Sequence, residues 1–274
     1  MSTITTLIEN SGSEHHSLET EHGLSFFITT PELPLIFDCG ATSRFISNAA
    51  RLHINLNQAD LVICSHSHYD HCGGYSDLIK NFGVKRLITG NSFFEPKFAY
   101  NGKKYTYLGA EFGIELLQEN NILHETCKDL MQISNDCWII GNFNRTNAME
   151  TIPDRFVRQT SHGYVMDDFS DEVSLAVKSG EGLAVIVGCS HPGILNILET
   201  IHERLSKPIT SVWGGSHLVE ADDNRIAYTI SKMKKLGVRR IGFSHCSGTR
   251  IAKYCHDDPE VIYAGLSTGD MVEI

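Results

Sequence analysis

The feature that most constrains this chain is a dense run of histidine and aspartate side chains: His66, His68, Asp70 and His71. The run directly follows Leu61–Cys64, an apolar segment that predicts a buried strand. Residues two apart lie on the same side of an extended segment, so the first two histidines can hold one cation. Gly73 and Gly74 then allow a sharp turn into a helix, which swings the aspartate and the third histidine toward a second cation.

Imidazole combined with carboxylate suits zinc, iron or manganese. The alternative explanation is a solvated loop that carries four ionisable residues within six positions. Histidine and aspartate residues are rarely spaced so closely behind a buried strand without a function. We therefore predict a site for one or two metal ions, with zinc as the first expectation and iron or manganese as the others.

Four side chains cannot close two metal sites, so further ligands are expected after other strands. Leu183–Val187 leads to His191 and Arg240–Phe243 leads to His245, and each histidine lies close to a glycine. Either one alone could be a capped loop histidine, but beside the first motif both are predicted ligands. Cys189 leaves two interpretations open, because a thiolate can bind or bridge a metal and a buried cysteine can also be a small apolar side chain.

The rest of the chain alternates short apolar runs with helical periodicity. Besides the three strands already named, runs of strand length occur at Leu24–Ile28, Leu35–Phe37, Arg86–Thr89, Cys137–Ile140, Val173–Val177 and Ile209–Trp213. Apolar residues three and four apart predict helices over 77–82, 110–120, 194–205 and 225–236. No repeat, low-complexity tract or polar linker interrupts the pattern, so residues 1–274 are expected to form one α/β domain.

Residues 91–107 depart from this alternation because they are irregular and rich in aromatic rings. The rings in this segment are Phe93, Phe94, Phe98, Tyr100, Tyr105 and Tyr107. So many rings exceed what a solvated connection needs. We therefore expect an inserted hairpin that either forms a lid over a site or buries a subunit interface, which would make the protein a homo-oligomer.

Charge and composition exclude several classes of partner and location. The chain carries 33 acidic against 23 basic residues, a net charge of −10, which works against nucleic acids and anionic membranes. Met1 to Asn10 lacks the basic and apolar regions of a signal peptide, and no apolar run is of membrane-spanning length. We expect a cytoplasmic protein whose eight cysteines are reduced, since none forms a CxxC pair.

These motifs resemble those of the metallo-β-lactamase superfamily, in which HxHxDH follows a strand and a histidine ends a late strand. Phe37-Asp38-Cys39-Gly40, before the motif, is part of the same superfamily resemblance. Further segments resemble the branch of 7,8-dihydropterin-6-methyl-4-(β-D-ribofuranosyl)aminobenzene 5′-phosphate synthases: Glu21-His22-Gly23-Leu24-Ser25, Gly188-Cys189-Ser190-His191-Pro192-Gly193, Gly214-Gly215-Ser216-His217-Leu218 and His245-Cys246-Ser247-Gly248. The resemblance covers residues 4–274. It implies a four-layer αββα sandwich with a dinuclear metal site along one edge, and metal-ligand roles for His66, His68, Asp70, His71 and His245.

Two departures from the superfamily pattern concern the second half of the site. Many members have a histidine in a TPGH-like turn, but 165–172 contains none, and His191 is expected to take its place. Many members also have a bridging aspartate in a Gly-Asp pair, where this chain has Gly188 and Cys189. The second metal is therefore expected to bind more weakly or not at all.

Four further residues are candidates for contacting a substrate: His22, His217, Ser247 and Arg250. His217 follows a predicted strand, where it either reaches the substrate or bonds to backbone. The hydroxyl of Ser247 and the guanidinium of Arg250 could hold a phosphate or carboxylate, or they could cap a helix.

The resulting hypothesis is a metal-dependent hydrolase or related transferase. A water whose pKa is lowered toward about 7 would be the nucleophile, with Asp70 orienting it and accepting its proton. The branch resemblance implies a small, anionic substrate that is a pterin-pathway or phosphorylated ribosyl compound. The alternatives are a generic phosphodiesterase or thioester hydrolase of the same superfamily, and a non-catalytic metal sensor.

Overall fold

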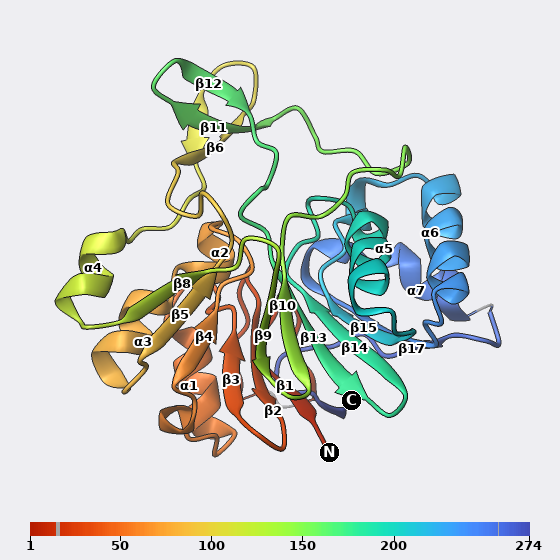
Figure 1. Ribbon diagram of the computed structural model, residues 1–274, viewed down its shortest axis with the longest axis horizontal. Helices are drawn as coiled ribbons and strands as arrows, with labels where there is room; N and C mark the ends of the chain where they lie inside the picture. The colour runs from red at the N-terminus through yellow and green to blue at the C-terminus, as the bar shows by residue number, and fades with distance from the viewer. Residues whose placement is uncertain (15–16, 257) are drawn as a thin grey trace.

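Two seven-stranded sheets pack face to face in the computed structural model, which describes residues 1–14, 17–256 and 258–274 (Figure 1). The first sheet has the order β18-β1-β2-β3-β4-β5-β8. Its strands are β1 (Thr3–Ile8), β2 (Ser25–Thr29), β3 (Pro34–Phe37), β4 (Leu61–Ile63), β5 (Arg86–Thr89), β8 (Leu123–Thr126) and β18 (Met271–Glu273). Because β1 pairs with β18, the two ends of the chain lie in the same sheet.

The second sheet has the order β17-β16-β15-β14-β13-β10-β9. Its strands are β9 (Leu130–Ser134), β10 (Cys137–Ile140), β13 (Ser174–Ser179), β14 (Gly182–Val187), β15 (Ile209–Gly214), β16 (Arg240–Phe243) and β17 (Ile262–Tyr263). The longer helices are α1 (Arg44–Arg51), α3 (Tyr75–Asn81), α4 (Ile114–Glu119), α5 (Ile194–Leu205), α6 (Asp223–Lys235) and α7 (Arg250–His256). In Figure 1, α1, α3 and α4 flank the first sheet, and α5, α6 and α7 flank the second.

Side chains alternate between the two faces of each strand, and this alternation places them in different layers of the core. Phe26 and Ile28 of β2 face the second sheet, whereas Phe27 between them packs toward the helices of the first half. On β14, Ala184 and Ile186 face the first sheet, and the residues beside them pack against α5 and α6. Both faces of these strands are buried, which explains their nearly continuous apolar sequence. The structure confirms the predicted αββα sandwich.

Most predicted elements agree with the structure, and the differences have local causes. β5, β10, β16 and α5 have the bounds expected from their sequences. The helix predicted over 110–120 is limited to Ile114–Glu119, because Gly113 before it has extended backbone angles. The strands β1 and β18 escaped prediction, since pairing between the two ends of the chain has no local signal.

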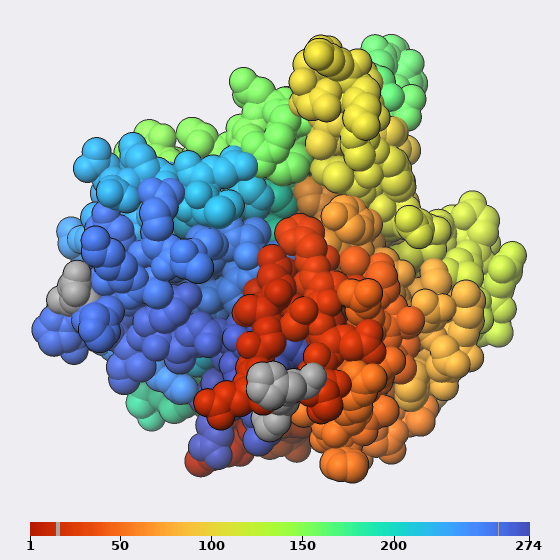
Figure 2. Space-filling view, turned by 180° about the vertical axis from the view of Figure 1, so that it is seen from behind, coloured from red at the N-terminus to blue at the C-terminus, as the bar shows by residue number. Residues whose placement is uncertain are grey.

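The aromatic segment forms half of a third sheet, with the order β12-β11-β6-β7. Its strands are β6 (Lys97–Tyr100), β7 (Tyr105–Tyr107), β11 (Phe156–Thr160) and β12 (Gly163–Met166). Figures 1 and 2 show this small sheet projecting from the sandwich. Phe93 and Phe94 are not part of it, because they pack with the core of the first half.

The small sheet has two chemically different faces. Register places five rings on the outer face: Phe98, Tyr100, Tyr105, Tyr107 and Tyr164. Tyr105 stacks on Tyr164 with ring centroids 3.8 Å apart. The opposite face carries Phe156 and Lys97, which contact the body of the protein. The outer rings therefore point away from the sandwich, and a subunit interface there stays a prediction that light scattering can test.

Lys97 anchors the small sheet through a buried ion triad. Its Nζ lies 2.5 Å from Asp171 Oδ1 and 3.1 Å from Asp167 Oδ2, and the lysine is 2% exposed. Burial acts to lower the pKa of Lys97, but the two carboxylates outweigh it and raise that pKa. The positive charge is therefore held inside the protein at neutral pH.

All eight cysteines are free thiols, in agreement with the expected reduced state. Among the residues that the structure describes, no helix is long and apolar enough to cross a membrane.

Candidate metal centre

The predicted ligands meet because parallel strands end at the same edge of each sheet. In the first sheet β3, β4 and β5 are parallel, and the turn after β4 carries His66 and His68. Asp70 and His71 lie on the short helix α2 (Tyr69–Cys72). In the second sheet β14, β15 and β16 are parallel, and their ends lead to Cys189, His217 and His245. Ligands at strand ends of an α/β sheet are the expected arrangement.

The first group of side chains consists of His66, His68 and His191. Their ring centroids lie 4.7 to 5.0 Å apart, and none of the three residues is more than 6% exposed. Burial lowers the pKa of His68 to about 3 and also holds the pKa of the other two well below the usual value. The rings are therefore neutral, which is the state in which imidazole binds a metal.

The second group consists of Asp70, His71 and His245. His71 Nε2 lies 3.2 Å from His245 Nε2, and Asp70 Oδ2 lies 3.3 Å from that same His245 atom. Burial alone would raise the pKa of Asp70, but the neighbouring His71, His22 and His245 hold it well below the usual value. The cluster therefore contains a carboxylate charge suited to a cation.

Unpaired buried nitrogens are the observation that tests whether a metal fits. The Nε2 atoms of His66, His68 and His191 are buried, and none has a hydrogen-bond partner in the described part of the chain. A buried polar atom without a partner is costly, so three of them on adjacent rings indicate a missing ligand. The donor set of imidazole, thiol and carboxylate suits zinc or another transition metal.

Cys189 lies where the two groups meet. Its Sγ belongs to a set within 4.8 Å of one another with His66 and His191, and to a second such set with His71 and His245. The thiol is 3.1 Å from His71 Nε2. This position is consistent with a thiolate shared between the groups, so the ligand interpretation of Cys189 gains geometric support.

Buried carboxylates hold the loops that carry these side chains, and sequence reasoning did not identify them as such. Asp38 accepts hydrogen bonds from Ser65 and from His71 Nδ1, the latter at 2.7 Å. The others are Glu9, which accepts from the His245 N–H; Asp171, which accepts from the Ser67 N–H; and Glu172, which accepts from the Ser190 and His191 N–H groups. All of these contacts join residues at least 18 positions apart in the chain, so no local pattern could reveal them.

An open cavity of about 380 Å³ lies against the centre. His22 and His217, two of the predicted substrate contacts, line it together with Asp70. Phe156 of the small sheet and Arg155, which directly precedes it, also line the cavity, although sequence reasoning did not select them. Arg155 is held by Glu220 through two hydrogen bonds.

The other two predicted substrate contacts lie outside this cavity. The Ser247 hydroxyl accepts a hydrogen bond from the Ser216 N–H, and the serine is 2% exposed. Arg250 donates to Asp223 and to the carbonyl oxygens of Val219 and Ala221. Both side chains therefore have structural partners, and Arg155 is the cationic side chain that reaches the cavity.

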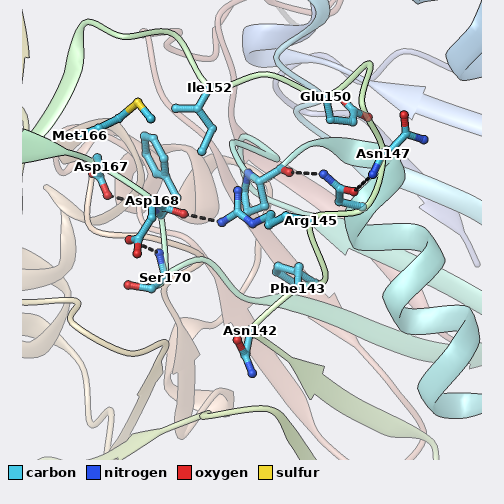
Figure 3. Close-up of a pocket in the computed structure, with 13 residues that line it drawn as sticks. Asn142, Phe143, Arg145, Asn147, Glu150, Ile152, Met166, Asp167, Asp168 and Ser170 are labelled. Atoms are coloured by element: carbon cyan, nitrogen blue, oxygen red, sulfur yellow. Dashed lines mark hydrogen bonds between the residues drawn. The ribbon is translucent and has the colours of Figure 1, made fainter.

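A second cavity of about 480 Å³ lies beside the centre and is shown in Figure 3. Phe169 lines it and stacks on His191 with ring centroids 3.9 Å apart. Arg145 points into this region and donates to the carbonyl oxygen of Asp168. No residue of the two histidine groups lines this cavity, so it adjoins the centre without being part of it.

Replacing Asp38 with Asn should weaken metal binding without unfolding the protein. Asp38 has φ +60°, a conformation that Asn tolerates, so the turn should survive. The change loses the charge that orients His71, and losing such a partner typically costs about 10–100-fold in metal affinity. Chelator competition measures the effect. The matched control is Asp60→Asn, an exposed pair with Lys85, and an equal affinity in both variants would contradict the proposed orienting role.

The profile of the metallo-beta-lactamase superfamily matches residues 19–192. The chain is 28% identical over 286 residues to the 7,8-dihydropterin-6-methyl-4-(beta-D-ribofuranosyl)-aminobenzene-5′-phosphate synthase of Methanocaldococcus jannaschii, covering 98% of this chain and 96% of that protein.

Solved structures give the same assignment of the fold. Tm1679, described as a metal-dependent hydrolase of the beta-lactamase superfamily, superposes with a TM-score of 0.86 at 29% identity, over 100% of this chain and 99% of that one. Zn²⁺-bound PqqB from Methylobacterium extorquens shares the fold with a TM-score of 0.59 at 8% identity, over 99% of this chain and 100% of that one.

Proposed function

This chain belongs to the metallo-β-lactamase superfamily, and we propose that it is a metal-dependent hydrolase acting on a small, anionic, phosphorylated substrate. The observation that carries the proposal is a group of three adjacent buried histidines whose Nε2 atoms have no hydrogen-bond partner in the described part of the chain; two of them, His68 and His191, line an open cavity. A structural histidine cluster would pair these nitrogens internally. Unpartnered nitrogens facing a cavity are suited to a bound cation that substrate can reach.

His66, His68 and His191 would hold one ion, and Asp70, His71 and His245 a second, with Cys189 between them. When bound, such ions supply a nucleophilic water at neutral pH and stabilise negative charge on a carbonyl or phosphoryl oxygen. The Asp70 carboxylate lines the cavity and its lowered pKa keeps it ionised, so the oxygen that does not bind an ion would be the one to accept a proton from the attacking water.

The substrate class draws on the chain's own cavity and on its similarity to known proteins. Arg155 can supply a positive charge to the substrate, because no other lysine or arginine is among the described residues that line the cavity. Its guanidinium keeps free N–H groups beyond the two that bond Glu220, and these can bind a phosphate. The similarity to a pterin-pathway synthase supports a phosphorylated ribosyl compound with a planar heterocycle.

The test combines metal analysis with an activity screen. We expect purified protein that has not met a chelator to contain about one to two equivalents of zinc, iron or manganese. It should hydrolyse a phosphorylated ribosyl substrate in preference to simple phosphodiesters, thioesters and lactams. A metal-free protein would contradict the proposal, and bound metal without turnover on any of these substrates would favour a sensor.

A further inference from the structure

The second group of ligands lacks the bridging aspartate that many superfamily members have, because Gly188 is followed by Cys189. We infer that His22, from the segment before β2, is an additional protein ligand of the second metal ion, together with Asp70 and His245. The inference deepens the proposed function and rests on it. It changes His22 from a substrate contact into part of the metal centre.

Distances between the donor atoms support this assignment. His22 Nε2 lies 3.2 Å from Asp70 Oδ2, and His245 Nε2 lies 3.3 Å from the same oxygen. Metal–ligand bonds of about 2.0–2.1 Å in a tetrahedral site place neighbouring donor atoms roughly 3.3–3.4 Å apart. All three donor atoms lie within 4.8 Å of one another. Two edges of the group therefore already have the spacing that a bound ion requires.

The backbone around His22 is built to bring this ring to Asp70. The Glu21 carboxylate accepts hydrogen bonds from Ala41, Thr42 N and the Thr42 hydroxyl. The Leu24 N–H donates to the carbonyl oxygen of Asp70 itself, at 3.1 Å. A Cβ on Gly23 would lie 2.9 Å from that same oxygen, so only glycine allows the approach. The segment on both sides of His22 is therefore fastened to the metal-binding region.

Neighbouring polar groups are compatible with metal binding through Nε2. Asn10 Oδ1 lies 2.9 Å from His245 Nδ1, which donates to it and leaves His245 Nε2 free for a metal. The contact between Asn10 Nδ2 and His22 Nδ1 is longer, at 3.3 Å. With a metal on Nε2, His22 carries its proton on Nδ1. Asn10 Nδ2 is itself a donor and cannot accept this proton, so its contact with Nδ1 must give way to a water molecule that can, which the 58% exposure of the His22 side chain allows.

Titration of metal-free protein with Co²⁺ tests the inference directly. Wild-type protein should bind two equivalents, seen by calorimetry and by the visible absorption of bound cobalt. His22→Ala should keep the first equivalent and bind the second more weakly, by more than the about 10–100-fold that loss of an outer partner costs. Circular dichroism should show a folded variant, since the side chain is largely exposed.

The matched control is His217→Ala, which removes a histidine of the same cavity that is not among the proposed metal ligands. It should leave both cobalt equivalents unchanged. If His22→Ala also binds two equivalents with unchanged affinity, His22 is not a ligand and the inference is wrong. Failure of the proposed function looks different, because wild-type protein itself would then bind no cobalt or show no hydrolysis.

Discussion

Lys97→Met is expected to reduce the free energy of unfolding by about 3–5 kcal/mol, the cost typical of breaking a buried ion pair by removing one partner. Methionine fits the space of the lysine stem but leaves Asp167 and Asp171 without their cation. Asp171 also accepts the Ser67 N–H beside the histidine motif, so the metal loop should loosen as well. Urea denaturation measures the loss, and chelator competition measures the accompanying change in metal affinity.

The exposed pair Lys85–Asp60 provides the control, since its lysine side chain is 72% exposed. Lys85→Met should change the unfolding free energy by no more than about 1 kcal/mol, as is usual for surface ion pairs. A similarly small effect of Lys97→Met would show that the triad is not a buried anchor. The raised pKa of Lys97 means that its contribution is complete at neutral pH and is lost only as the pH rises through that pKa.

Asp70→Asn is expected to lower kcat by about 10²-fold or more, in line with the loss of a general base. Asparagine has nearly the same size and keeps one acceptor oxygen, so the fold should be unchanged. It lacks the charge that balances the cations and the lone pair that takes the proton. The rate should be measured at saturating metal, because the same change also weakens metal binding.

Asp77→Asn is a suitable control for the loss of charge, because Asp77 lies on α3 in an exposed pair with Lys80. It should keep the wild-type rate. If Asp70→Asn, fully loaded with metal, turned over the true substrate at nearly the wild-type rate, the proton would have to leave through another group.

Local patterns were sufficient for most strands and helices and for the core of the site, whereas the sandwich arrangement was expected from the family resemblance. A short run such as Arg86–Thr89 favours burial because its central side chains are apolar, whichever elements it packs against. Its strand could therefore be predicted from the sequence. HxHxDH concentrates its donors within six residues, and a strand followed by glycines leaves few ways to arrange them. His191 and His245 could be added because each follows a buried strand, and such ends meet along one edge.

Tertiary structure decided which other side chains reach that edge. Arg250 follows His245 closely in sequence, yet its guanidinium donates to carbonyl oxygens and to Asp223. Arg155 lies just before β11, and its side chain lines the cavity. The aromatic segment was recognisable, but register alone determined that its outer rings turn away from the centre.

The sequence by itself determined an α/β domain, the HxHxDH motif and the strand ends that bring His191 and His245 to it, because these depend on periodicity and on contacts within a few residues, and the resemblance of its motifs to a known family implied the αββα arrangement. Only the tertiary structure decided that Asp38 and Glu172 hold the metal loops, and that His22 lies 3.2 Å from Asp70. Those contacts join residues far apart in the chain, and their geometry follows from how the two sheets pack rather than from any local pattern.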